Sequence, residues 1–263
     1  MASTLDMDEL SRIADLTTSL ASLSRPIIYQ WFRQNPEISK KSDASPVTIA
    51  DKAVETALRA AIHQAFPTHN IIGEEDGTST NNSPYTWVID PIDGTRAFSC
   101  GNPMFGTLVA VLYENRPVIG LIDLPAMHQT WMGIDGLPTR LNGDLATTAQ
   151  VTDLKNARLA TTSGHALGDD YPRFAQLSEQ AMVTGFGGDC ANYAHLASGW
   201  CDVVAESNLN AYDIMATIPV ITGAGGVISQ WDGTPITLDK YDGTALASAS
   251  AKLHDSALTA LGR

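Results

Sequence analysis

Two aspartates separated by two residues follow a short apolar stretch of this sequence. Asp90 and Asp93 stand in the run WVIDPIDGTRAF, in which Val88 and Ile89 favour a buried strand. Because Pro91 lacks a backbone donor, we expect the strand to end there. Both carboxylates would then lie at the end of a sheet, where ligands of α/β proteins commonly bind. Carboxylates are also the ligands that Mg²⁺ prefers in proteins.

The residues after the two aspartates suit an anion. Gly94 permits a tight turn, and a helix that begins near it would direct the N–H groups of Gly94, Thr95 and Arg96 toward one point. Such a point binds phosphate, and Mg²⁺ ligands beside it indicate metal-assisted phosphate chemistry. Taken alone, the motif has a simpler explanation, in which Asp90 caps a turn and Asp93 caps a helix.

Other acidic residues stand near the ends of predicted elements. Asp51 falls in the first turn of a helix predicted over 50–66, Glu74 follows a short predicted strand, and Asp213 lies near the start of a helix predicted over 211–223. Each has an alternative explanation: the helix dipole for Asp51, a solvated hairpin tip for Glu74 and an N-cap for Asp213. Their shared position at element ends allows the side chains to converge.

Hydrophobic periodicity predicts helices and strands along the whole chain. The expected helices cover 5–32, 50–66, 171–180, 189–200, 211–223 and 252–261. The expected strands cover 70–72, 87–90, 105–113, 117–123, 129–134, 159–162, 182–184, 201–206, 227–231 and 245–249. This alternation predicts a layered α/β architecture.

A polar stretch over 144–153 suggests a division between two halves. We place residues 1–147 in an N-terminal half and residues 148–263 in a C-terminal half, and expect the two to form one compact unit. Pro26 and Pro219 fall inside predicted helices, which we expect them to kink or split. A further polar segment, 40–46, is expected to be a mobile loop.

Composition narrows the class of function. The 263 residues are 44% hydrophobic and 17% charged, as in ordinary globular proteins. The net charge of −13 argues against nucleic-acid binding and against docking on anionic membranes. No apolar run approaches the ~20 residues of a membrane span. Three cysteines without zinc-site spacing, and an N-terminal region unlike a signal peptide, favour free thiols and a cytoplasmic protein.

Three motifs together resemble those of the inositol monophosphatase family of Mg²⁺-dependent phosphatases. They are GEE at 73–75, DPIDGT at 90–95, and YD at 212–213 ahead of GAGG at 223–226, in the family's order and spacing. The resemblance implies an alternating α-β-α-β-α sandwich of the inositol monophosphatase and fructose bisphosphatase type. It also implies a homodimer, a small phosphorylated metabolite as substrate, and two or three Mg²⁺ ions per active site.

The resemblance implies roles for individual residues as well. The implied metal ligands are the side chains of Glu74, Asp90, Asp93 and Asp213 and the carbonyl of Ile92. Asp51 and Thr95, together with Glu74, would position and activate the attacking water. The N–H groups of Gly94 and Thr95 would hold the phosphate. Because several carboxylates in one pocket raise one another's pKa, bound divalent cations would stabilise their charged form.

Residues around this cluster favour the histidinol-phosphate phosphatases within the family. Inositol phosphatases usually have a small polar residue and Asn where this chain has Arg96 and Ala97, whereas DGTRAF resembles the histidinol-phosphate branch. Asp189 stands where inositol enzymes usually have a small residue, and Glu206 matches a position that contacts the alcohol part of the substrate. The expected substrate-binding residues are Gly94, Thr95, Arg96, Asp189, Glu206 and Asp213.

The chemistry of histidinol phosphate agrees with this choice, although two residues depart from the pattern. The ammonium and imidazole groups of that substrate suit charge-assisted hydrogen bonds to Asp189 and Glu206, whereas inositol offers only hydroxyls. The alternative for Asp189 is a helix cap after Gly188. Asn210 and Ala211 replace the Lys-Pro pair that is common in histidinol-phosphate relatives.

The sequence therefore predicts a Mg²⁺-dependent phosphomonoesterase that converts histidinol phosphate to histidinol in histidine biosynthesis. The alternatives with the same fold are an inositol monophosphatase and a broad-specificity sugar-phosphate or nucleotide 3′-phosphatase. An alternative of another class is a non-catalytic metal-binding regulatory protein, against which the complete set of acids argues.

Overall fold

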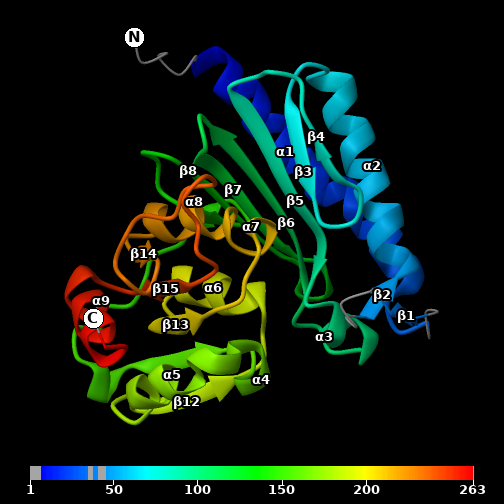
Figure 1. Ribbon diagram of the computed structural model, residues 1–263. Coiled ribbons are helices and arrows are strands. Elements are labelled where there is room, and N and C mark those ends of the chain that lie inside the picture. The colour runs from blue at the N-terminus through cyan, green and yellow to red at the C-terminus, as the bar shows by residue number, and fades with distance from the viewer. Residues whose placement is uncertain (1–6, 35–37, 41–45, 263) are drawn as a thin grey trace.

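The protein is built from five stacked layers, three of helices and two of β-sheet (Figure 1). The computed structural model describes residues 7–34, 38–40 and 46–262, so the predicted loop at 40–46 lies mostly outside the described residues. Helices α1 and α2 cover one face of an eight-stranded sheet. Helices α6, α7 and α8 fill the space between it and a five-stranded sheet, whose outer face packs against α5 and α9. The predicted α-β-α-β-α sandwich is confirmed.

The element bounds agree with most of the predicted ranges. The helices are α1 (Met7–Trp31), α2 (Ile49–Ala65), α3 (Thr95–Ser99), α4 (Gly164–Leu167), α5 (Tyr171–Ser178), α6 (Cys190–Ala197), α7 (Ala211–Ile214), α8 (Thr217–Gly223) and α9 (Ala251–Ala260). Short 3₁₀ turns cover Pro125–Met127, Leu154–Asn156 and Gly168–Asp170.

The strands form two larger sheets and a small hairpin. The hairpin pairs β1 (Ile38–Lys40) with β2 (Pro46–Thr48). In spatial order, the eight-stranded sheet contains β10 (Asp144–Leu145), β9 (Arg140–Leu141), β8 (Gln129–Ile134), β7 (Arg116–Leu124), β6 (Gly106–Tyr113), β5 (Tyr85–Asp93), β3 (Asn70–Gly73) and β4 (Gly77–Ser79). The five-stranded sheet contains β12 (Val183–Phe186), β11 (Arg158–Thr161), β13 (Val203–Glu206), β15 (Ala245–Ser248) and β14 (Val227–Ser229).

The central strands are apolar on both faces because both faces are buried. In β5, Trp87 and Ile89 pack toward α1 and α2, while Val88 between them packs into the middle layer. Two glycines allow the middle layer to approach the sheet closely. A Cβ added at Gly120 or Gly133 would overlap the backbone of α8 or of the turn before it. The middle layer, which carries Asp213 on α7, is thereby held against β7 and β8.

Strand β5 does not end at Pro91, as the sequence predicted, but runs on to Asp93. Its pairing with β6 shifts register between Asp90 and Asp93. The missing N–H of Pro91 is tolerated at this irregularity, and the hydroxyl of Thr107 donates to the carbonyl of Pro91 (2.8 Å). Residues three apart in a regular strand point to opposite faces. The register shift lets the two aspartates line the same cavity.

Neither of the other two prolines splits its helix. Helix α1 continues past Pro26, where the neighbouring Arg25 makes a bidentate ion pair with the buried Asp123 of β7 (2.6 and 3.0 Å). The predicted helix over 211–223 is two helices, α7 and α8, but the break lies at residues 215–216. Pro219 is the third residue of α8, where a backbone N–H has no partner within the helix.

Two predictions concern the whole chain, namely its division into two halves and the absence of a membrane span. The structure does not test the division into residues 1–147 and 148–263, which stays a prediction. Within the described part of the chain, no helix combines the length and the hydropathy needed to cross a membrane.

Candidate active site

Predicted site residues from the eight-stranded sheet, from α3 and α7 and from the start of α6 meet at one cavity of about 300 Å³. It lies where the ends of β3 and β5 approach the first residues of α3 and α7. Its lining residues are Glu74, Asp90, Ile92, Asp93, Gly94, Thr95, Arg96, Asp189, Asn208, Asn210, Tyr212 and Asp213. All five predicted metal ligands are therefore on its wall, together with most of the predicted substrate residues.

Three carboxylates in this cavity are close enough to share a cation. Asp90, Asp93 and Asp213 each offer an oxygen within 4.8 Å of the other two. Oδ1 of Asp90 is buried and has no hydrogen-bond partner among the described residues. A buried carboxylate oxygen without a donor is costly. A divalent cation at this point would satisfy it, so the residues fit the expected metal.

The pKa values of the three carboxylates also indicate a site for a cation. Burial, followed by the negative charge of Glu74, raises the pKa of Asp90 well above its usual range. Burial and the charge of Asp189 raise the pKa of Asp93 in the same direction. Burial raises the pKa of Asp213 to about 7, against the opposing hydrogen bond from Asn210. Without a cation, this cluster favours bound protons.

Glu74 and Asp213 owe their positions to local backbone structure. Gly73 and Gly77 pair across the β3–β4 hairpin, which leaves Glu74 in its tight turn and on the cavity wall. The hairpin tip and the cavity carboxylate, which the sequence left as alternatives, are both correct. Asn210, rather than Asp213, occupies the N-cap of α7. Its N–H donates to Oδ2 of Asp213 (2.6 Å) in a capping box, so the start of α7 fixes this carboxylate.

The predicted phosphate-binding turn has the expected geometry. Gly94 has φ +82° and precedes α3, which begins at Thr95. The helical hydrogen bonds start with the N–H of Phe98, which donates to the carbonyl of Gly94 (3.0 Å). The N–H groups before it therefore have no acceptor within the helix. The hydroxyl of Thr95 donates to the carbonyl of Ile92 (3.1 Å), which links the turn to the metal-ligand candidates.

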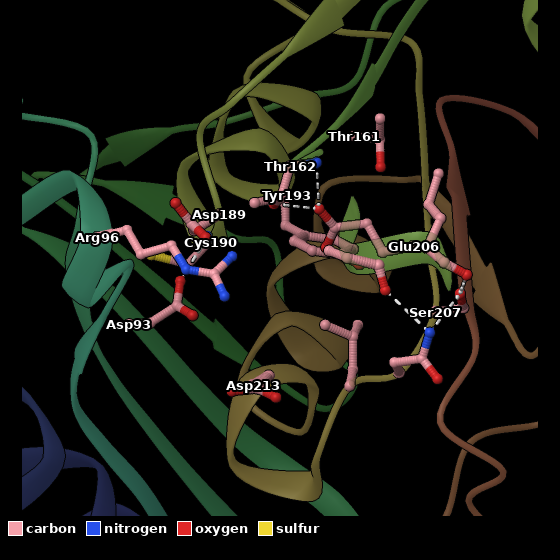
Figure 2. A pocket seen from close by; sticks show the side chains of 14 residues that line it. Asp93, Arg96, Thr161, Thr162, Asp189, Cys190, Tyr193, Glu206, Ser207 and Asp213 are labelled. Atoms are coloured by element: carbon pink, nitrogen blue, oxygen red, sulfur yellow. Dashed lines mark hydrogen bonds between the residues drawn. The ribbon is translucent and has the colours of Figure 1, made fainter. Parts of the chain in front are cut away.

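A second cavity, of about 160 Å³, adjoins the first and shares five lining residues with it, namely Asp93, Arg96, Asp189, Asn208 and Asp213. Figure 2 shows Arg96 extending from α3 toward Asp93 and Asp189, with Glu206 on the opposite side. The acid cluster and the predicted substrate residues therefore belong to one continuous site.

Glu206 is a buried acid in this second cavity. Its Oε1 accepts hydrogen bonds from the N–H and the hydroxyl of Thr162 (2.9 and 2.5 Å). Burial raises the pKa of Glu206 to about 6, against these stabilising hydrogen bonds. Tyr193, whose hydroxyl is buried, lines the same space (Figure 2). The second cavity thus places a carboxylate and a phenol in the same space as Asp93 and Asp213 of the acid cluster.

Comparison with models of known protein families gives a match over nearly the whole chain. The family model described as "Inositol monophosphatase family" matches residues 9–262. This chain belongs to that family. Inositol monophosphatase family members are metal-dependent phosphatases, usually with Mg²⁺, that act on small phosphorylated substrates.

Individual members of the family are similar over most of their length. The chain is 40% identical to the chloroplastic bifunctional phosphatase IMPL2 of Arabidopsis thaliana, covering 98% of this chain and 78% of that protein. It is 32% identical to a histidinol-phosphatase of Mycobacterium tuberculosis, covering 85% of this chain and 87% of that protein. The solved structure of an inositol monophosphatase from Zymomonas mobilis is similar with a TM-score of 0.88 and 36% identity, covering 98% and 100% of the two chains.

In this family member, Asp189 is not a helix cap in the usual sense. It occupies the N-cap position of α6, but its side chain makes no capping hydrogen bond with the described residues. Its carboxylate lies over the phosphate turn, since a Cβ added at Gly94 would lie 3.1 Å from its Oδ2. Burial raises the pKa of Asp189 to about 6, partly offset by the positive charge of Arg96.

Sequence reasoning missed one contact to the acid cluster. The N–H of Cys190, the first residue of α6, donates to Oδ2 of Asp93 (2.6 Å). Gly187 and Gly188 precede it with φ of +92° and +118°, and Asp189 itself has φ +44°. The glycine pair ahead of a predicted helix was the available signal for a helix N-terminus directed at an anion.

Asp51 lies behind the site rather than on its surface. It is 1% exposed in the first turn of α2, and it lines neither of the two cavities. Its negative charge is one of those that raise the pKa of Asp90. The structure therefore places Asp51 near the acid cluster but separates it from the cavity itself.

Proposed function

We propose that this chain is a Mg²⁺-dependent phosphomonoesterase whose substrate is histidinol phosphate. The observation that carries the choice of substrate is the second cavity. It holds two carboxylates, the half-buried Asp189 and the buried Glu206, next to the phosphate turn and the acid cluster. Carboxylates in that position suit a leaving group that carries positive charge.

The acid cluster would hold the metal. The proposed ligands are the side chains of Glu74, Asp90, Asp93 and Asp213 and the carbonyl of Ile92. Two or three Mg²⁺ ions, when bound, would polarise the phosphate, lower the pKa of water and stabilise the leaving alkoxide. The unsatisfied Oδ1 of Asp90 and the raised pKa of its neighbours support this assignment.

The chain's own groups would bind the phosphate and orient the water. We assign phosphate binding to the N–H groups of Gly94 and Thr95, with Arg96 close by. We assign the orientation of the attacking water to Glu74 and Thr95, both on the cavity wall. Asp51 would act only indirectly, through the charge that it places near Asp90. Phosphate esters need positioning and charge stabilisation more than a protein nucleophile.

The names of the relatives are compatible with this substrate without deciding it. The Mycobacterium tuberculosis relative is a histidinol-phosphatase, and the Arabidopsis thaliana relative is a bifunctional phosphatase. The Zymomonas mobilis structure is of an inositol monophosphatase. For that reason, inositol phosphate is the second candidate substrate of this chain.

Steady-state kinetics with three substrates tests the proposal. We expect kcat/KM with Mg²⁺ to be highest for histidinol phosphate, lower for inositol 1-phosphate and lowest for a nucleotide 3′-phosphate. A preference for inositol 1-phosphate would assign the chain to the second candidate and leave Asp189 without the proposed role.

We also propose that the protein is a homodimer. Strand β12 lies at the edge of the five-stranded sheet and exposes Val183 and Phe186, and the preceding Met182 is exposed as well. An exposed apolar edge strand favours pairing with another chain. Light scattering after size exclusion would measure the mass of the particle. The cytoplasmic location stays a prediction.

A further inference from the structure

The inner face of α2 carries charged residues at intervals of four. Asp51, Glu55 and Arg59 therefore lie one above the other on the helix. Glu55 is fully buried, with 0% of its side chain exposed. The other inward residues of this helix are apolar, namely Ala50, Val54, Leu58 and Ile62. A buried carboxylate is costly unless it is paired and hydrogen-bonded, so its partners show what it holds in place.

The Glu55 carboxylate is bonded to the hairpin turn that carries Glu74. Its Oε2 accepts a hydrogen bond from the N–H of Glu75 (2.7 Å), and its Oε1 accepts one from the N–H of Asp76 (3.0 Å). Oε1 also accepts from Nε of Arg59 (2.7 Å), which balances the charge. The two backbone donors directly follow Glu74, so they fix the chain on its C-terminal side.

Arg59 and Gly73 complete the attachment of the hairpin. One guanidinium nitrogen of Arg59 donates to the carbonyl of Gly77, and another to the hydroxyl of Ser79 (3.4 Å). On the other side of the turn, a Cβ added at Gly73 would overlap Oε1 of Glu55 and lie 2.7 Å from the guanidinium of Arg59. The ion pair therefore packs directly against the backbone on both sides of Glu74.

We propose that Glu55 is a positioning residue that holds the Glu74 carboxylate at the acid cluster and so sets the affinity of the site for Mg²⁺. The inference rests on the proposed function, because it requires the cluster to bind Mg²⁺. A turn that is already ordered loses less conformational entropy when its carboxylate takes up a ligand position. Residues that support metal ligands typically change metal affinity by about 10- to 100-fold when they are mutated.

The test compares two variants by calorimetric titration with Mg²⁺ in the absence of substrate. Glu55→Gln keeps the size of the side chain but places an NH₂ group where an acceptor is needed. Gly73→Ala keeps every charge and displaces the carboxylate sterically. We expect the Mg²⁺ dissociation constant to rise by about tenfold or more in both. We also expect kcat at saturating Mg²⁺ to fall, because the proposed function assigns orientation of the attacking water to Glu74. KM should change little, since neither substituted residue lines the cavity.

Asp202→Asn provides a matched control. Asp202 is also a fully buried carboxylate that pairs with an arginine, Arg158 (2.8 Å), and accepts a backbone N–H (2.7 Å), but it lines neither cavity. This control should lower the melting temperature and leave the Mg²⁺ dissociation constant unchanged.

Different results would contradict the proposed role of Glu55 and the proposed Mg²⁺-dependent activity. If both test variants keep the wild-type dissociation constant while losing thermal stability, as in the control, Glu55 is only structural and the inference is wrong. If Glu55→Gln does not fold, the result for Gly73→Ala decides alone. If the wild-type protein neither binds Mg²⁺ nor releases phosphate, the proposed function fails, and the inference fails with it.

Discussion

Asp189 and Glu206 are acids whose charge depends on their surroundings in the second cavity. Burial is the largest cause of the raised pKa of each, and it brings both values to about 6. Near neutral pH both would be charged, and each would lack a full counter-charge until a cation enters the cavity. Arg96 offsets part of this cost for Asp189. A cationic leaving group would offset the rest, which is the physical basis of the substrate proposal.

The first prediction is that Asp189→Asn separates substrates by the charge of their leaving group. The change keeps the side-chain size but removes one charge-assisted hydrogen bond, worth about 1.5–3 kcal/mol. We expect kcat/KM for histidinol phosphate to fall by roughly 10- to 100-fold and that for 4-nitrophenyl phosphate to change little. Similar losses on both substrates would show that Asp189 only shapes the site.

The second prediction concerns pH. Because the pKa of each acid is about 6, both lose their negative charge as the pH falls through that value, and their attraction for a cation disappears. The ratio of kcat/KM for histidinol phosphate to that for 4-nitrophenyl phosphate should therefore fall as the pH is lowered from 8 to 5. Taking the ratio cancels effects common to both substrates. A ratio that does not change with pH would contradict the prediction.

At the scale of the elements, the site depends on departures from regular structure. The register shift in β5 turns two aspartates toward one cavity, and the β3–β4 turn places Glu74 beside them. The φ of +82° at Gly94 sets the direction of α3. Each departure is held by a contact to another element, so the geometry of the site depends on the packing of those elements.

The third prediction is that Gly94→Ala damages both stability and activity. An alanine at this positive φ costs about 1–2 kcal/mol of backbone strain, and its Cβ would lie 3.1 Å from Asp189 and 3.2 Å from the carbonyl of Met104. Urea unfolding and steady-state kinetics would measure the two losses. Gly136→Ala is the control, because Gly136 has φ +77° with no described atom within 4 Å of an added Cβ. It should lose comparable stability and keep its activity.

At the scale of the whole molecule, the layered architecture was predictable from the sequence, and so were the members of the acid cluster. Alternating apolar segments predicted the layers, and the motifs at 73–75, 90–95 and 212–213 predicted the acids. The continuation of β5 past Pro91 was not predictable, because it depends on pairing with β6. The burial of Glu55 beneath the hairpin was missed as well. The i, i+4 pair that it forms with Arg59 looks in sequence like an ordinary surface pair.

The fourth prediction links the acid cluster to the stability of the whole protein. Asp90→Asn removes the free-energy cost of keeping this buried carboxyl either charged beside other acids or protonated at neutral pH, so it should raise the melting temperature in EDTA. For the wild type, Mg²⁺ at 100 times its dissociation constant should add about 2.7 kcal/mol to the free energy of unfolding. The variant should lose most of this gain. Calorimetric melting of both proteins, with and without Mg²⁺, provides the comparison. A wild type that melts at the same temperature in Mg²⁺ and in EDTA would contradict the proposed metal site.

The most direct test of the account is phosphate release from histidinol phosphate by the purified protein, measured in Mg²⁺ and in EDTA and repeated with Asp93→Asn. The account predicts turnover by the wild type in Mg²⁺, and none above background in EDTA or in the variant. Full activity of Asp93→Asn, or wild-type activity that persists in EDTA, would contradict a metal-dependent reaction at the acid cluster. A wild type that binds Mg²⁺ but releases no phosphate from any of the three substrates would identify a non-catalytic metal-binding protein.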